Sequence, residues 1–116
     1  MQLFCYTTRS GGEPVREFIR ALPEETQFEV LVLLRRLEND ETLTMPHCRS
    51  LAAMARGLYE LRVGDRQGQV RIFYYTKLKQ GLFLIHALRK KRRTIPDKDR
   101  LLIIRRIKEL QKLYQG

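Results

Sequence analysis

The sequence predicts an α+β domain with a small, mostly antiparallel sheet and a helical hairpin on one of its faces. Apolar residues recur with a helical period before residue 40 and again after residue 95. Between them, three apolar segments rich in aromatic and β-branched residues are separated only by short glycine-bearing loops, which suit antiparallel strands. The chain of 116 residues is long enough for one domain with a hydrophobic core, and we expect residues 1–116 to form that single domain.

A strand and two helices are expected before residue 40. The segment LFCYTT at 3–8 is aromatic and β-branched, which predicts a strand that stops at Ser10-Gly11-Gly12. Pro14 suits the first turn of a helix, and helical spacing then relates Val15, Phe18, Ile19 and Leu22. A second helix begins after Pro23 and ends near Asn39-Asp40, with Leu31, Leu34 and Leu37 along one side.

The rest of the chain predicts a connector, three strands and a last helix. The connector, TLTMPHCRSLAAMARG at 42–57, has some helical character around 51–54. Strands are predicted at 57–63, 69–77 and 82–88. From about Pro96 to Tyr114, one helical stripe carries Ile103, Ile104, Ile107, Leu110 and Tyr114. No internal repeat or linker interrupts this order, so one compact α+β domain is the simplest architecture.

Positive charge is concentrated in the C-terminal part of the chain. Residues 1–46 hold 5 Lys or Arg and 8 Asp or Glu, whereas residues 47–116 hold 18 and 5, and the net charge is +10. This polarity favours an anionic partner, and a polyphosphate chain fits it better than a membrane surface. Five of the cations follow one another as RKKRR at 89–93.

Several classes of protein are disfavoured by composition. The longest apolar run, VLVLL at 30–34, is too short to span a membrane, and the N-terminus lacks the layout of a signal peptide. We therefore expect a soluble, cytoplasmic protein. Cys5 and Cys48 are expected to stay reduced, and no cysteine or carboxylate spacing predicts a zinc site or another metal or cofactor site.

One face of the predicted sheet collects positive charge. Strand alternation puts Arg62 beside Glu60, and it puts Arg71 on one face with Phe73 and Tyr75. If the helical hairpin covers the opposite face, the face with Arg62 and Arg71 is open. The cations at 89–93 would reach its rim, and the two aromatic rings could stack on bases, as in single-stranded nucleic acid binding.

The same residues could also have purely structural roles. Arg62 and Glu60 could form an exposed pair on one strand, and the run at 89–93 could be a solvated loop. Phe73 and Tyr75 could belong to the core. The two histidines, His47 and His86, could serve structure alone.

Several phrases of the sequence resemble, in their order and spacing, the phage-derived branch of the HigB/RelE toxins of type II toxin–antitoxin modules. These phrases are PVREFIRALPEET, MPHCRSL, GLYELRV, QVRIFYY, LIHALRKK and the proline at 96. The resemblance extends from Tyr6 to about Arg106. It implies a small sheet flanked by helices and a metal-independent endoribonuclease that cuts messenger RNA, usually on the ribosome. It also implies an inhibiting antitoxin, in this branch commonly a helix-turn-helix protein.

The resemblance also implies roles for individual residues. Arg71 matches the arginine that clamps the phosphate, Arg62 matches a basic position on the preceding strand, and Lys90 matches the basic position at the exit of the last strand. With lower specificity, His47 and Arg49 match a histidine and a basic residue in the connector of related toxins, and His86 matches a histidine on the last strand of this branch. Arg49 and the neighbours of Lys90 in the basic run are expected to bind RNA; these neighbours are Arg89, Lys91, Arg92 and Arg93. Where this branch usually has Lys-Thr-Pro, the sequence has Thr94-Ile95-Pro96, and the tyrosine that some RelE toxins carry after the basic run has no counterpart. The resemblance therefore does not identify the general acid.

The chemistry implied is attack by the ribose 2′-OH on the adjacent phosphate. Arg71, with Lys90 or Arg62, would stabilise the extra charge, and His47 or His86 would move protons, with Glu60 as another candidate base. The products would be a 2′,3′-cyclic phosphate or 3′-phosphate and a 5′-hydroxyl. Two alternatives are a non-catalytic RNA- or DNA-binding module and an inactive toxin relative that serves as a partner subunit.

Overall fold

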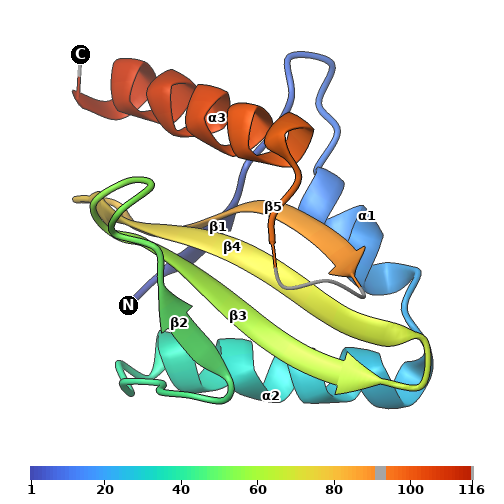
Figure 1. Ribbon diagram of the computed structural model, residues 1–116. Helices are drawn as coiled ribbons and strands as arrows, with labels where there is room; N and C mark the ends of the chain where they lie inside the picture. Colours follow the sequence, from blue (N-terminus) through green and yellow to red (C-terminus); the bar gives the residue numbers. More distant parts are fainter. Residues whose placement is uncertain (91–93, 116) are drawn as a thin grey trace.

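A computed structural model describes residues 1–90 and 94–115, and these form an α+β fold in which helices lie on both faces of one sheet (Figure 1). The elements follow the chain as β1 (Leu3–Cys5), α1 (Pro14–Arg20), α2 (Glu24–Glu38), β2 (Cys48–Ser50), β3 (Leu58–Asp65), β4 (Gly68–Leu78), β5 (Gly81–Lys90) and α3 (Asp97–Gln115). The predicted fold class is confirmed. None of the helices in the described part of the chain is long and apolar enough to cross a membrane.

The sheet has the strand order β1-β5-β4-β3-β2. All neighbouring strands are antiparallel except β1, which runs parallel to β5. Gly81 permits this last pairing, because its φ is +150° and a Cβ atom there would lie 2.2 Å from the backbone oxygen of Gln2.

Two local predictions differ from the structure. The connector contains a three-residue strand, β2, whose residues pair with β3 from Tyr59 to Leu61; three residues are too few for strand periodicity to be recognised. The helical character expected around 51–54 amounts to one turn, in which the N–H groups of Met54 and Ala55 both donate to the oxygen of Leu51. The first strand ends at Cys5 and not at residue 8.

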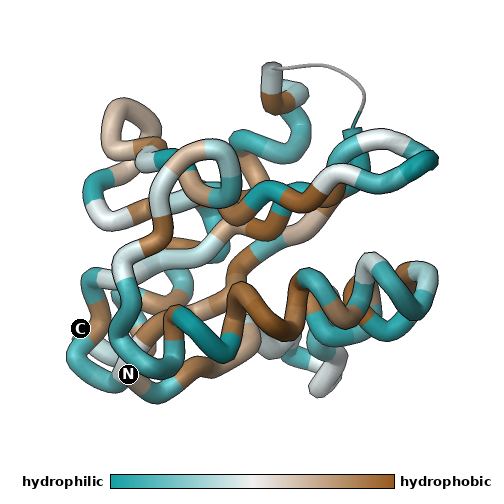
Figure 2. Tube along the Cα trace, turned by 90° about the horizontal axis from the view of Figure 1, so that it is seen from below, coloured by the Kyte–Doolittle hydropathy of each residue, from teal (hydrophilic) through white to brown (hydrophobic). Residues whose placement is uncertain are grey.

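Two hydrophobic cores lie on the two faces of the sheet. The first lies beneath α1 and α2. Its members from these helices are Val15, Ile19, Val30, Leu33, Leu34 and Leu37, and Leu22, in the turn between the helices, joins them. Leu31, predicted on the same side as Leu34, is 48% exposed, because the buried stripe of α2 runs through Val30 and Leu33. Figure 2, seen from the side on which α2 lies, shows apolar residues along the middle of this helix and hydrophilic ones towards its ends.

The second core lies beneath α3, and it overturns part of the prediction for the open face. Phe73 and Tyr75 are 0% and 4% exposed and belong to this core with Ile103, Ile107 and Leu110 of α3. The prediction that the two rings stack on bases is therefore wrong, because the last helix covers the half of the face on which they lie. Beyond α3 the same face carries Glu60, Arg71 and Arg62, whose side chains are 0%, 2% and 17% exposed, so the face predicted to be open is largely closed there as well.

Candidate functional site

Three arginines from three neighbouring strands surround one buried carboxylate. Glu60 on β3 is 0% exposed, and its Oε1 lies 3.5 Å from Nη2 of Arg49 on β2 and 3.4 Å from Nε of Arg62. Its Oε2 lies 3.4 Å from Nη1 of Arg71 on β4. Gln69 links two of the arginines, since its Oε1 accepts from Nε of Arg71 at 3.0 Å and from Nη2 of Arg62 at 3.3 Å. We call Arg49, Arg62 and Arg71 around Glu60 the arginine cluster.

The sheet register explains why these side chains meet. Arg62 pairs directly with Arg71 across β3 and β4, and Arg49 pairs with Glu60 across β2 and β3. Side chains of paired residues lie on the same face of a sheet. Gln69 lies two residues before Arg71 on the same face.

The cluster carries more positive than negative charge. One carboxylate faces three guanidinium groups, whose side chains are 40% (Arg49), 17% (Arg62) and 2% (Arg71) exposed. Burial lowers the pKa of Arg71, an effect that Glu60 opposes, and the group stays protonated as arginines in proteins do. Among the described residues, Nε of Arg49 and Oε1 of Glu60 are buried without a hydrogen-bond partner of good geometry. The cluster therefore has donors and positive charge to offer to an anion.

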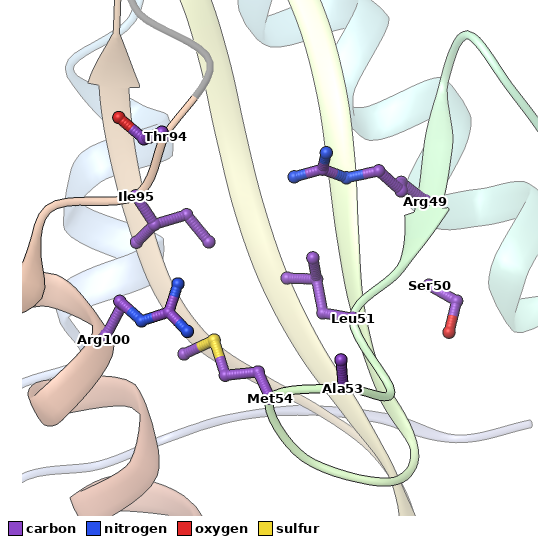
Figure 3. A pocket seen from close by; sticks show the side chains of 8 residues that line it. All are labelled: Arg49, Ser50, Leu51, Ala53, Met54, Thr94, Ile95 and Arg100. Atoms are coloured by element: carbon purple, nitrogen blue, oxygen red, sulfur yellow. The ribbon is translucent and has the colours of Figure 1, made fainter.

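A cavity of about 420 Å³ lies beside the cluster, between the connector and the start of α3 (Figure 3). Arg49 reaches into it from one side and Arg100 from the other, with an apolar wall between them. Its lining consists of Arg49, Ser50, Leu51, Ala53, Met54, Thr94, Ile95 and Arg100. Sequence patterns had not indicated Arg100 or Met54, because these two residues are far apart in the sequence and only the fold brings the connector next to the start of α3.

Arg89 and Lys90, the basic residues at the end of β5, lie on opposite faces of the sheet. Lys90 pairs with Gln69, on the face of the arginine cluster, and its Nζ donates to the oxygen of Thr94. Arg89 pairs with Val70 on the opposite face, where its Nη1 bonds to Oδ1 of Asp65. The structure thus does not bring Arg89 to the cluster. The predicted RNA contacts Lys91, Arg92 and Arg93 lie outside the described residues.

His86 points towards α3 because β5 contains a bulge. The register changes between Phe73, which pairs with His86, and Tyr74, which pairs with Leu84. His86 Nε2 lies 2.8 Å from Oδ1 of Asp99, and its Nδ1 lies 3.3 Å from Nη1 of Arg106. Because arginine only donates, Nδ1 is the acceptor and the ring proton is on Nε2. Both ring nitrogens of His86 thus contact α3. The ring of Phe73 stacks against His86, and Phe73 lies on β4, the strand that separates His86 on β5 from Glu60 on β3.

His47 lies nearer to the cluster. It is exposed, and its backbone oxygen accepts from the N–H of Arg62 at 2.8 Å. A second cavity, of about 560 Å³, lies between the end of β3 and α2. His47 lines it together with Arg62 and Gln69. Of the two histidines, His47 is therefore the one beside the arginines.

Carboxylates and other ligands do not gather into a metal-binding group in the described part of the chain. No set of three His, Cys, Asp or Glu side chains lies close enough together there to hold an ion. Asp97 and Asp99 are both in the first turn of α3, where negative charge favours the positive end of the helix.

Comparison with known proteins identifies the family. None of the curated proteins matches the chain significantly. The model of the family described as "Phage derived protein Gp49-like (DUF891)" matches residues 17–108, which is well over half of the chain and includes the whole arginine cluster. The chain therefore belongs to the phage-derived Gp49-like family, a family of HigB-like toxins.

Proposed function

We propose that this protein is the toxin of a type II toxin–antitoxin module and that it cleaves messenger RNA on the ribosome without a metal ion. Membership of a HigB-like toxin family supports the proposal. The observation that carries it is the convergence of three guanidinium groups on one buried carboxylate. A phosphodiester carries one negative charge, as the carboxylate of Glu60 does, and it accepts hydrogen bonds from the same planar guanidinium donors. The arginine cluster therefore has the groups that bind a phosphodiester.

The reaction uses the nucleophile that RNA contains. The 2′ oxygen forms a bond to the adjacent phosphorus, the bond from phosphorus to the 5′ oxygen breaks, and the products are a 2′,3′-cyclic phosphate and a 5′-hydroxyl. Arg71, assisted by Arg62 and Lys90, stabilises the extra negative charge of the phosphorane. A preorganised donor of this kind typically contributes about 3–4 kcal/mol to the transition state.

Two protons must move in this reaction, one from the 2′-OH and one to the 5′ oxygen. Of the two histidines, His47 is exposed beside Arg62, whereas both ring nitrogens of His86 have partners on α3. We therefore assign proton transfer to His47 and a structural role to His86. Glu60 contacts three guanidinium groups, and its role is to hold them in place.

A non-catalytic RNA-binding module, or an inactive toxin relative, is the second candidate. The side chain of Arg71 is 2% exposed and paired with Glu60, which is also what a purely structural ion pair looks like. In that case the cluster would stabilise the sheet, and exposed cations elsewhere would bind RNA through charge alone.

An antitoxin, commonly a helix-turn-helix protein in this branch, is the proposed protein partner. Helix α2 exposes three large apolar side chains, with Phe28 68%, Leu31 48% and Val32 43% accessible. An exposed apolar patch of this kind is typical of a surface that another protein covers.

Induced expression with mapping of transcript ends tests the proposal. Cells that express the parent should stop growing, and primer extension should find new 5′ ends inside messenger RNAs. Cells that express Arg71→Lys should grow, whereas Arg35→Lys, at an exposed position of α2, should behave as the parent. Normal growth and intact messages at verified expression of the parent would favour the non-catalytic module.

A further inference from the structure

We infer that the cavity between Arg49 and Arg100 is a subsite for one nucleobase of the RNA and that it sets a base preference next to the cut. This inference rests on the proposed function. It assigns a binding role to a surface that lies outside the arginine cluster and shares only Arg49 with it.

The shape and lining of the cavity fit a flat, largely apolar group. Its volume of about 420 Å³ lies within the range of about 300–1,000 Å³ typical of ligand sites. The wall between the two arginines consists of Leu51, Met54 and Ile95 (Figure 3). Leu51 and Met54 are only partly buried, although both pack against the core beneath α3. They thus present apolar surface that the faces of a base can cover.

The sequence of the connector agrees with such a wall. In the strongly basic part of the chain, the five residues at 51–55, LAAMA, carry no charge at all. They follow Arg49 directly in the fold, because β2 ends at Ser50 and the chain then turns over the sheet. An uncharged surface placed next to a guanidinium matches a nucleotide, in which an apolar base adjoins a charged phosphate.

Two guanidinium groups flank the apolar wall from opposite sides. Arg49 comes from β2 and lies 3.5 Å from Glu60, so it connects the cavity to the arginine cluster. Arg100 comes from the first turn of α3 and reaches in from the other side (Figure 3). In an RNA strand every base lies between two phosphates, and a guanidinium can bind a phosphate or stack on a base. A base against Met54 would thus leave its own phosphates near these two arginines.

A pair of neighbouring alanines gives a matched test. Ala52 and Ala53 are both exposed, but only Ala53 lines the cavity. Ala53→Trp fills the cavity without changing the charge of the protein, whereas Ala52→Trp adds the same side chain outside it. Each variant is first checked by a thermal melt, and Ala53→Leu serves as the smaller replacement if Ala53→Trp is not folded.

Two readouts are needed, so that the subsite and the catalytic activity are judged separately. The first is the affinity of each protein for the four nucleoside monophosphates. The second is the base preference next to the cut in an RNA with a randomised stretch. Ala53→Trp should weaken the best mononucleotide by about tenfold, the lower end of what one stacked base contributes, and should flatten the base preference. Ala52→Trp should change neither.

The outcomes separate the two proposals. If Ala53→Trp and Ala53→Leu cleave with the affinity and base preference of the parent, the subsite is refuted and the nuclease remains. If the parent cleaves no RNA, the proposed function fails, and the subsite stands only if mononucleotides bind and Ala53→Trp weakens them. If the parent binds none of the four mononucleotides and shows no base preference, the subsite is refuted.

Discussion

Arg71 and Glu60 lie side by side on neighbouring strands, with 3.4 Å between Nη1 and Oε2 and with 2% and 0% of their side chains exposed. Gln69 accepts a further hydrogen bond from Nε of Arg71 at 3.0 Å. A buried charge without such partners would strongly destabilise the fold. These contacts fix the plane of the Arg71 guanidinium before any substrate binds, which is what preorganised catalysis requires.

Replacing Arg71 with lysine should slow cleavage far more than it weakens binding. Lysine keeps the charge but offers a point charge in place of a planar pair of donors. Loss of one aligned donor is worth roughly 3 kcal/mol, or about a hundredfold in rate. Affinity should change little, because a net charge of +10 still attracts RNA. Single-turnover cleavage at saturating enzyme measures the rate, and titrations at two salt concentrations measure affinity.

The matched control for this variant is Arg35→Lys, which should cleave at the rate of the parent. A folded Arg71→Lys variant that cleaves within about threefold of the parent would show that Arg71 is an ordinary phosphate contact. In that case the arginine cluster would not be the catalytic centre.

Replacing Glu60 with glutamine should destabilise the protein and make it respond to anions. The change keeps the shape of the side chain but leaves three guanidinium groups without their shared counter-charge. Breaking a buried pair by removing one partner typically costs about 3–5 kcal/mol, and the exposure of Arg49 places this case at or below the lower end. Melting curves with and without inorganic phosphate measure the effect.

Phosphate should raise the melting temperature of Glu60→Gln by more than it raises that of the parent, because an anion bound at the accessible side of the cluster would supply the counter-charge that glutamine lacks. Equal shifts in both proteins would mean that the cluster is closed to anions. Chloride at the same ionic strength distinguishes site binding from general screening.

The sequence predicted the fold class and the face shared by Arg62 and Arg71, because strand alternation is a local property. It did not predict that α3 covers Phe73 and Tyr75, since an aromatic residue on a strand has the same local pattern whether a helix or solvent lies above it. Likewise, a bulge decides where His86 points, and alternation cannot reveal an extra residue. Gln69 and Arg100 were missed because each gains its role only from a partner on another element.

Chelation should not affect cleavage. The 2′-OH of the RNA is the nucleophile and guanidinium groups stabilise the charge, so no step of the proposed reaction uses a metal ion. Cleavage of an RNA oligonucleotide should proceed at the same rate with EDTA as with magnesium, at matched ionic strength. A rate that EDTA abolishes and magnesium restores would contradict the mechanism.

Lys90→Ala and Arg89→Ala should have different effects, although each removes one positive charge from adjacent positions. Arg89 bonds to Asp65 and is the main reason that the pKa of Asp65 is about 2, so its loss should lower the melting temperature at pH 7. Lys90 lies on the face of the arginine cluster, so its loss should flatten the salt dependence of RNA affinity by about 0.7 in slope. The proposed face would be wrong if Arg89→Ala reduced the slope and Lys90→Ala did not.

The buried contact of His86 with α3 should make the protein less stable as the pH falls below neutrality. Burial lowers the pKa of His86 below its ordinary value of 6.5; Asp99 opposes this effect and Arg106 adds to it. The unfolded chain therefore binds more protons than the native protein between the lowered pKa and 6.5. The contribution of His86 to the free energy of unfolding is complete above pH 6.5 and is lost as the pH drops, at no more than about 1.4 kcal/mol per pH unit.

Thermal melts between pH 7.5 and pH 5 of the parent, His86→Gln and His47→Gln test this assignment. Glutamine at position 86 can still donate to Asp99 but does not titrate, so the melting temperature of His86→Gln should fall less on acidification than that of the parent. His47 is exposed, so His47→Gln is the control that removes a histidine without touching α3. Asp65, with its pKa of about 2, does not titrate in this range. Parallel curves for all three proteins would show that His86 does not titrate differently in the folded and unfolded states, and the structural role assigned to it would lose its support.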